Sequence, residues 1–240
     1  MVEIDLTVGE SVEYNASDLT EEKLMSARLT LDPSLEFYLN SNLSDIDKAL
    51  VVGAGVGVAS KILTSNGKDV TNIEPIESRF DILEINCPSA TNIMKACDSS
   101  SGTGTMYYFN DNESGAKLNT NFGNASENVD VITVDSLDLD DLDILIVTAN
   151  GKELDILEGA ATTIADNTGI KVVITWVPDL MDDIDQAVTD LKALPFTSYK
   201  IIHWEDSDNS VSYRNQYTDE YPDDNLKIVQ QAVVLMEQYG

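Results

Sequence analysis

A turn of three glycines followed by an acid is the part of this chain whose spacing could do chemistry. Gly53, Gly55 and Gly57 follow the apolar run Ala49–Val52, and Glu74 closes the next β-like run. Glycines in so tight a turn let the backbone approach a ligand that a Cβ atom would exclude. A carboxylate about twenty residues downstream can accept hydrogen bonds from ribose hydroxyls. The pattern predicts a nucleoside-binding α/β domain; the alternative is a glycine turn in another kind of α/β protein.

The spacing of the glycines separates two kinds of nucleoside-binding fold. Dinucleotide-binding folds have their third glycine at the position that Val58 holds, whereas this chain has it at Gly57. Gly-x-Gly-x-Gly with a later Glu is similar to the pattern of S-adenosylmethionine-dependent methyltransferases. The resemblance implies a cofactor site, with Asp98 near the adenine side. The residues expected to bind the cofactor are Gly53, Ala54, Gly55, Gly57, Glu74 and Asp98.

Strand-like and helix-like segments alternate along the chain and would position this turn. The expected strands are Ala49–Val52, Asp69–Ile73, Asn92–Ala96, Leu142–Val147, Lys171–Val177, Tyr199–Trp204 and Leu226–Met236. The expected helices are Val58–Ser65, Ser78–Ile85, a segment ending at Ala161, and Met181–Leu194. The last two strands have no helical pattern between them. The order predicts an α/β fold with a seven-stranded, mostly parallel sheet whose final strand is antiparallel to its neighbours.

Two regions fit this alternation less well. Residues 1–46 carry short alternating runs and a helix-like patch, Thr20–Arg28, and are expected to form a β-rich lead-in packed on a main domain of residues 47–240. Between Ser99 and Asn128 the sequence is polar, with Thr105–Phe109 its one clear strand. Val129–Val134 then alternates as an edge strand would.

The net charge of the chain indicates the kind of solution in which the protein works. There are 43 acidic residues against 14 basic ones, a formal charge of −29, and the acids are spread over the whole length. Because 42% of the residues are hydrophobic and fall in periodic blocks, disorder does not explain this composition. A carboxylate-coated surface suits concentrated salt, where self-repulsion is screened. We expect a protein of a halophile or of its virus, the alternative being an ordinary acidic cytosolic protein, and no nucleic-acid partner.

Other sequence features exclude several classes of protein. The N-terminus lacks a secretory signal and no stretch is long and apolar enough to span a bilayer, so a cytoplasmic or virion-associated location is expected. Cys87 and Cys97 are interpreted as buried free thiols, with a disulfide as the alternative. The acidic runs Asp138–Asp143 and Asp206–Ser210 lack the glycine and glutamate of a calcium loop, so no metal site is assigned.

The order of motifs resembles the FkbM family of methyltransferases over roughly residues 35–236. The matching segments are Val52–Gly57, Ile73–Pro75, Asn86, Gly104–Ser114, Val131–Leu137 and Gly151–Ala160. The last segment, which ends in Gly-Ala, is the most specific. The resemblance implies a Rossmann-like class I methyltransferase fold, S-adenosylmethionine as cofactor, and methylation of a hydroxyl oxygen on a sugar, lipid or secondary metabolite.

Four pocket positions that are acidic in the family are not acidic here. They hold Val51, Thr148, Asn150 and Thr175. In so acidic a chain random drift should add carboxylates, so their loss is informative. Charge-assisted hydrogen bonds are about twice as strong as neutral ones, and cofactor binding should therefore be weakened. The single histidine, His203, sits in a strand where a structural role is favoured, and no catalytic residue is assigned.

Two functions of different classes follow from these observations. One is a catalytically degenerate methyltransferase-fold module that acts as a structural or interaction component, such as a virion protein, with protein partners or self-association. It explains the missing acids and the missing base. The other is an active S-adenosylmethionine-dependent O-methyltransferase acting on a glycan, lipid or small-metabolite hydroxyl. It explains why the glycine turn and Glu74 survive.

Overall fold

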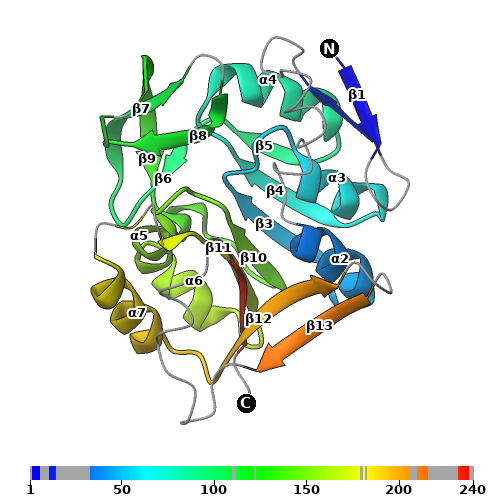
Figure 1. The fold of residues 1–240 in the computed structure, drawn as a ribbon. Helices are drawn as coiled ribbons and strands as arrows, with labels where there is room; N and C mark the ends of the chain where they lie inside the picture. The colour runs from blue at the N-terminus through cyan, green and yellow to red at the C-terminus, as the bar shows by residue number, and fades with distance from the viewer. Residues whose placement is uncertain are drawn as a thin grey trace.

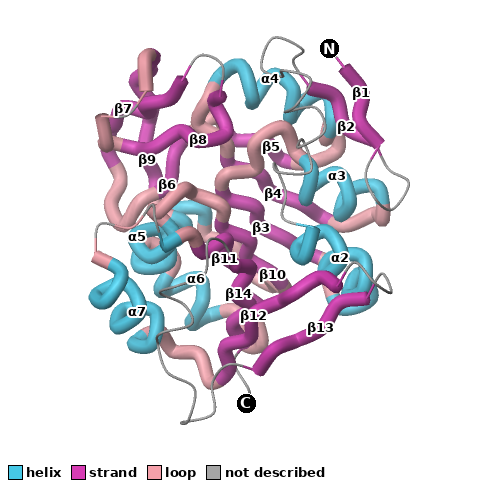
Figure 2. The backbone as a smooth tube through the Cα atoms, in the orientation of Figure 1, coloured by secondary structure: helices cyan, strands magenta, loops and turns pink. Residues whose placement is uncertain are grey.

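The fold was determined as a computed structural model (Figure 1). It describes residues 2–5, 11–14, 33–109, 112–121, 123–178, 181, 183–205, 210–215 and 232–237. Figure 2 shows how strands form the centre of the molecule while helices lie to either side of it.

A mixed eight-stranded sheet forms the core, in the order β13-β12-β14-β11-β10-β3-β4-β5. The strands are β3 (Lys48–Val52), β4 (Asp69–Ile73), β5 (Thr91–Ile93), β10 (Ile144–Val147), β11 (Lys171–Trp176), β12 (Ser198–Glu205), β13 (Ser210–Asn215) and β14 (Ala232–Glu237). Strands β5, β4, β3, β10 and β11 pair in parallel. β14 lies antiparallel between β11 and β12.

The expected α/β fold is therefore confirmed, including the reversed final strand. The seven expected strands all contribute to the sheet, and β13 adds an eighth beside β12. Residues 226–231, the first part of the expected last strand, lie outside the described residues. The expected strand Asn92–Ala96 is wrong in extent, because the backbone turns after β5, where Lys95 N donates to Ile93 O at 3.1 Å.

Helices cover both faces of this sheet (Figure 1). They are α2 (Pro33–Asn42), α3 (Val58–Ser65), α4 (Glu77–Asn86), α5 (Glu153–Glu158), α6 (Ala161–Asp166) and α7 (Ile184–Ala193). Side chains alternate between the two faces along a strand. Leu145 and Val147 accordingly join one buried cluster with residues of α5, α6 and α7, while Ile144 and Ile146 join another with residues of α2 and α3.

Helix α2 is absent from the expectation for the N-terminal region. It contacts α3 and β12, and Leu35 and Leu39 are buried against the sheet. The expected strand content of this region is present as the antiparallel pair β1 (Val2–Asp5) and β2 (Ser11–Tyr14). The helix-like patch Thr20–Arg28 lies outside the described residues, and the boundary after residue 46 stays a prediction.

The polar region after β5 forms a second sheet, in the order β6-β9-β7-β8. Its strands are β6 (Ala96–Cys97), β7 (Gly102–Phe109), β8 (Asn112–Leu118) and β9 (Ala125–Ile132). The expectation of one clear strand here was wrong, as was the interpretation of Val129–Val134 as an edge strand. β9 lies between β6 and β7, and its alternation arises because one face of this sheet is more exposed. The segment ends in the short 3₁₀ helix η4 (Val134–Leu137).

Cys87 and Cys97 are both free and buried, as expected. Burial raises the pKa of the Cys87 thiol to about 11 and that of Cys97 to about 12. Within the described part of the chain, no helix is long and apolar enough to cross a membrane. The same residues contain no cluster of His, Cys, Asp or Glu that could hold a metal ion.

Candidate functional site

The glycine turn joins β3 to α3 at the carboxyl end of the central strands. Gly53, Gly55 and Gly57 have φ angles of 73°, 59° and 91°, in the left-handed region that favours glycine. A Cβ atom on Gly53 would lie 1.9 Å from the carbonyl oxygen of Thr148. The N–H groups of Gly53 and Ala54 both donate to the carbonyl of Ile73, at 2.9 and 3.0 Å. The turn therefore needs its glycines for its own packing as well as for any ligand.

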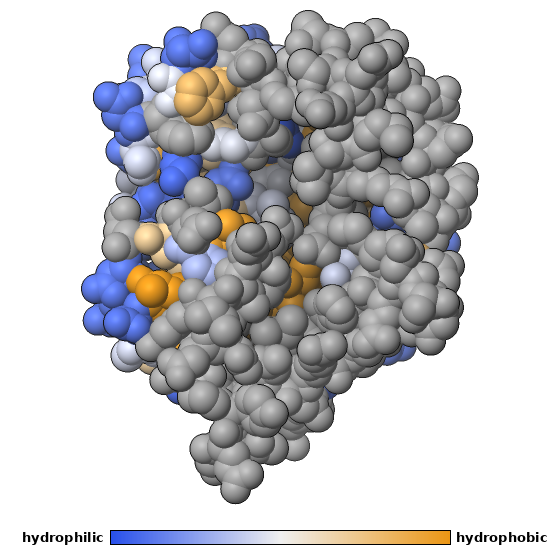
Figure 3. Space-filling model, in the orientation of Figure 1, coloured by the Kyte–Doolittle hydropathy of each residue, from blue (hydrophilic) through white to orange (hydrophobic). Residues whose placement is uncertain are grey.

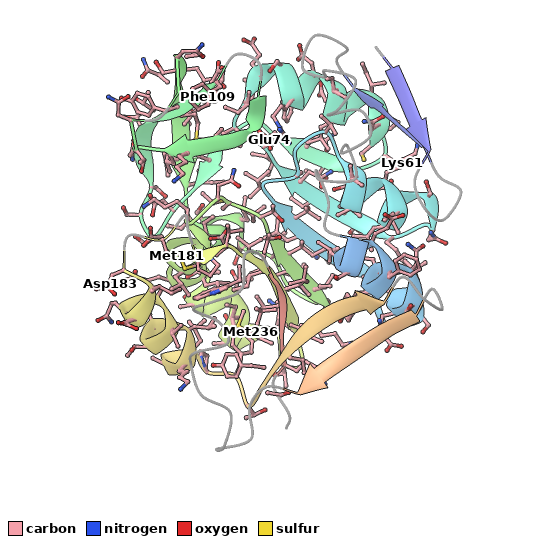
Figure 4. The ribbon with its side chains drawn as sticks, viewed as in Figure 1. Lys61, Glu74, Phe109, Met181, Asp183 and Met236 are labelled. Carbon is pink, nitrogen blue, oxygen red and sulfur yellow. The ribbon has the colours of Figure 1, made fainter. Side chains whose placement is uncertain are left out.

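Glu74 lies next to this turn, and both of its carboxylate oxygens are engaged by the chain itself. Oε2 accepts a hydrogen bond from Gly55 N at 2.8 Å, and Oε1 accepts one from Ile76 N at 3.1 Å. Only 4% of the residue is exposed. Figure 4 shows Glu74 near α4 and the second sheet. The sequence placed Glu74 correctly beside the turn, but its carboxylate faces the backbone.

Arg79 is a site residue that the sequence analysis missed. It lies in the first part of α4, and its Nη2 atom would be 2.3 Å from a Cβ atom on Gly55. Its Nε atom is 3.9 Å from Glu74 Oε1. The sequence did contain a signal for this contact. Arg79 follows the expected ribose-binding acid by five residues and lies in the first turn of a helix.

The loop after β10 faces the glycine turn, because β10 pairs in parallel with β3 and both strands end at the same edge of the sheet. Thr148 N donates to Val52 O at 2.9 Å, which joins the loop to the end of β3. The hydroxyl groups of Thr148 and Thr175 lie 3.2 Å apart and form a hydrogen bond. Asn150 adopts a left-handed φ of 52°, and its Nδ2 donates to Ala116 O on β8 at 3.0 Å. These side chains thus bond to one another and to the second sheet.

Glu153, at the start of α5, is a second buried acid next to this loop. Its Oε1 accepts from Ala149 N at 3.0 Å and its Oε2 from Gly151 N at 2.9 Å. Burial raises the pKa of its carboxyl to about 7, although the hydrogen bonds from the loop act in the opposite direction. Glu153 lies in the family-like segment Gly151–Ala160, but its residue type alone did not indicate a role.

Asp98 follows β6, and its side chain contacts a cation from α5's N-terminal side. Lys152 Nζ is 3.8 Å from Asp98 Oδ2 and 2.6 Å from Asp155 Oδ2. Asp98 Oδ1 also accepts from Ser99 N at 2.8 Å. The backbone of Asp98 lies so close to Gly159 that a Cβ atom there would be 2.4 Å from the Asp98 carbonyl oxygen. This contact explains the glycine between α5 and α6, which divides the single expected helix.

The structure also places Val51 and His203, which the sequence singled out, and Trp176, which follows Thr175 on β11. Val51 is buried in the cluster that includes α3, and 3% of it is exposed. Trp176, after Thr175 at the end of β11, is fully buried. His203 lies on β12, which is separated from β3 by β14, β11 and β10.

Three features of this site carry the resemblance to a known protein family. They are the glycine turn, the acid after β4, and the Gly-Ala pair between α5 and α6. The profile of the Methyltransferase FkbM domain matches residues 52–194. The chain belongs to this family. No curated protein sequence matches it.

Solved structures of methyltransferases share the fold of this FkbM-family chain. The Methyltransferase FkbM from Methylobacillus flagellatus KT superposes with a TM-score of 0.52 at 16% identity, over 93% of this chain and 55% of that one. The TehB-like SAM-dependent methyltransferase from Corynebacterium glutamicum gives 0.50 at 12% identity, over 91% and 94%. The T. thermophilus 16S rRNA N2 G1207 methyltransferase, solved with AdoMet and guanosine, gives 0.51 at 12%, over 99% and 50%. The chain thus spans about half the length of the first and third of these proteins.

Proposed function

We propose that this chain is a methyltransferase-fold module that has lost catalysis and serves as a structural or interaction component in a high-salt setting. The observation that carries the proposal is the state of Glu74. Both of its oxygens accept hydrogen bonds from the chain's own backbone, and Arg79 lies against Gly55 beside it. A ribose would need these oxygens as acceptors, and each oxygen already has one of its two acceptor positions filled. With Arg79 also lying over Gly55, the residues as arranged disfavour the ribose of S-adenosylmethionine.

The four positions without family acids support the same proposal. Val51 is buried among apolar side chains, and Thr148 and Thr175 bond to each other. Asn150 donates to the second sheet, which a carboxylate could not do. A cationic cofactor would therefore find neutral groups at these positions, where the family supplies charge. The neutral side chains at these positions instead make hydrogen bonds within the fold.

The exposed acids support the high-salt setting, in a halophile or its virus. They occur on many separate elements of the described chain, and include Asp45, Asp47, Asp69, Asp81, Glu84, Asp130, Asp140, Glu158, Asp166 and Asp190. Figure 3 shows hydrophilic side chains gathered over β7–β9 and α7 on the left of the view. Such a surface repels phosphates, so a protein partner or a second copy is expected and a nucleic acid is not.

Three exposed apolar side chains are available for self-association in the described part of the chain. Among the described residues Ile85 and Met94 are each 49% exposed, and Phe109 is 39% exposed. Figure 4 labels Phe109 in the second sheet, where it is the last residue of β7. In this proposal a protein partner, such as a virion subunit, covers these side chains.

An active O-methyltransferase is the second candidate function, and the preserved turn favours it. Gly53, Gly55 and Gly57 keep positive φ angles, and the chain belongs to a methyltransferase family. One structural relative is described as SAM-dependent and another was solved with AdoMet. In this alternative S-adenosylmethionine is the cofactor, and the acceptor is a hydroxyl of a glycan, lipid or small metabolite.

Calorimetric titration with S-adenosylmethionine and S-adenosylhomocysteine in molar sodium chloride tests the proposal. Circular dichroism should show that the protein is folded under these conditions. We expect no detectable heat of binding. Micromolar binding, together with methyl transfer that Glu74→Ala abolishes and Glu158→Ala preserves, would establish the enzyme instead. Glu158 is an exposed acid on α5 and serves as the matched control.

A further inference from the structure

We propose that Arg79 is an internal occupant of the nucleoside site, and that its guanidinium excludes a ribose from Gly55 and Glu74. The proposal deepens the proposed function, on which it rests for the place of the site. It names the residue that closes the site.

The position of the guanidinium is the first argument. A Cβ atom on Gly55 would meet Arg79 Nη2 at 2.3 Å and Cζ at 3.4 Å. The guanidinium therefore occupies the space that the missing side chain of Gly55 leaves open. In nucleoside-binding turns this space lets the backbone approach the ligand. A nucleoside could take it only after Arg79 had moved away.

The charge of Glu74 is the second argument. Arg79 Nε lies 3.9 Å from Glu74 Oε1, and the two side chains are 14% and 5% exposed. Separating two charges that are largely removed from water leaves each of them with an unfavourable environment. A ligand that displaced Arg79 would have to replace its charge with neutral hydroxyl groups. The pair therefore opposes binding of a ribose beyond its steric effect.

The place of Arg79 in α4 is the third argument. It is the third residue of the helix, where the partial positive charge of the helix N-terminus disfavours a cation. The chain has 14 basic residues among 240, so a cation at such a position needs a local reason. The carboxylate of Glu74 provides that reason.

A corresponding pair on the adenine side agrees with this interpretation. Asp98, the other acid expected to bind the cofactor, has Lys152 Nζ 3.8 Å from its carboxylate. Both expected cofactor acids thus face a cation of the chain itself. Arg79 differs from Lys152 in that it also fills the space over a glycine.

The test compares the affinity for S-adenosylhomocysteine of the wild type, Arg79→Ala and Arg79→Gln, by calorimetry in molar sodium chloride. The matched control is Lys68→Ala, which removes a cation paired with Asp47 at 3.4 Å, at the amino ends of the strands. We expect Arg79→Ala to bind S-adenosylhomocysteine at least tenfold more tightly than the wild type does. If the wild type shows no binding, the affinity of Arg79→Ala should exceed the detection limit of the calorimeter at least tenfold. Lys68→Ala should match the wild type.

Equal affinity in the wild type and Arg79→Ala, or no binding by either, would overturn the role of Arg79. If Arg79→Ala does not fold, Arg79→Gln decides by the same criterion, because it keeps much of the side chain but removes the charge. Micromolar binding by the wild type would overturn the proposed function. The ratio of variant to wild type would then still decide whether Arg79 opposes the ligand.

Discussion

The side-chain amide of Asn150 donates a hydrogen bond to the backbone carbonyl of Ala116 at 3.0 Å, and this bond ties the loop after β10 to strand β8 of the second sheet. The resemblance to the FkbM family implies an acid at the position that Asn150 holds. A carboxylate has no proton to donate at neutral pH. The amide of Asn150 therefore makes a contact between the loop and the second sheet that a carboxylate could not make.

Asn150→Asp should lower the free energy of unfolding by about 1–2 kcal/mol, because the donor is lost and a charge is placed against a carbonyl oxygen. Denaturant unfolding in molar salt measures the change. Asn119→Asp is the matched control: Asn119 also has a left-handed φ, 55°, but its Oδ1 accepts from Thr105 N at 2.9 Å, which Asp can also do. Equal destabilisation by both variants would contradict the prediction.

Glu153 should make the stability depend on pH. Its pKa is raised by burial to about 7, above the ordinary value of 4.5, so the native state holds a proton that the unfolded chain releases at lower pH. The stability that Glu153 contributes is fully present below its pKa in the unfolded chain, and it is lost as the pH rises through its pKa in the folded protein. The expected loss is about 3 kcal/mol.

The comparison of wild type with Glu153→Gln isolates this effect from the other carboxylates. Unfolding free energies measured across this pH range in molar salt should show the wild type losing stability relative to the variant as pH rises. Parallel curves for the two proteins would show that Glu153 does not titrate in this range.

Asp135 should stabilise the start of α6. Its Oδ1 accepts from Thr163 N at 2.8 Å and its Oδ2 from Thr162 N at 3.1 Å. Burial by itself raises the pKa of Asp135, but the hydrogen bonds from Thr163 and Thr162 together hold it below its usual value. Its contribution is present above the unfolded pKa and is lost as pH falls through the lowered one.

Asp135→Ala should therefore reduce the free energy of unfolding by about 1 kcal/mol at neutral pH, as the loss of a helix cap does. Asp166→Ala, at the exposed end of the same helix, is the control and should change stability little. Thermal melts at neutral and acidic pH measure both. A loss that is unchanged in acid would argue against an ionised cap.

Salt should stabilise the whole protein. If the 43 acids adapt it to brine, its melting temperature should rise steeply between about 0.1 M salt, where the Debye length is about 10 Å, and molar salt. Thermal melts in sodium chloride measure the rise, with sucrose as a non-ionic control. Equal stability at low and high salt would remove the inference of a high-salt setting.

The sequence alone determined the parts of the fold that depend on local pattern. The apolar strands β3, β4 and β10, helix α3 with its glycine turn, and the reversed last strand could all be predicted. Hydrophobic periodicity and glycine spacing record which face of an element is buried and where the backbone must turn. The placement of Glu74 beside Gly55 followed from the same spacing.

Only the tertiary structure decided what surrounds these residues. Strand β8 is polar and has no strand-like pattern, and it exists because β7 pairs with it. Arg79 against Gly55, Lys152 beside Asp98, and Asn150 on Ala116 are contacts between residues that are ordinary in type and separate in sequence. Such contacts depend on how segments distant in sequence pack together, and the local sequence pattern does not predict this packing. The direction in which the Glu74 carboxylate faces was therefore set by packing, while its position was set by the sequence.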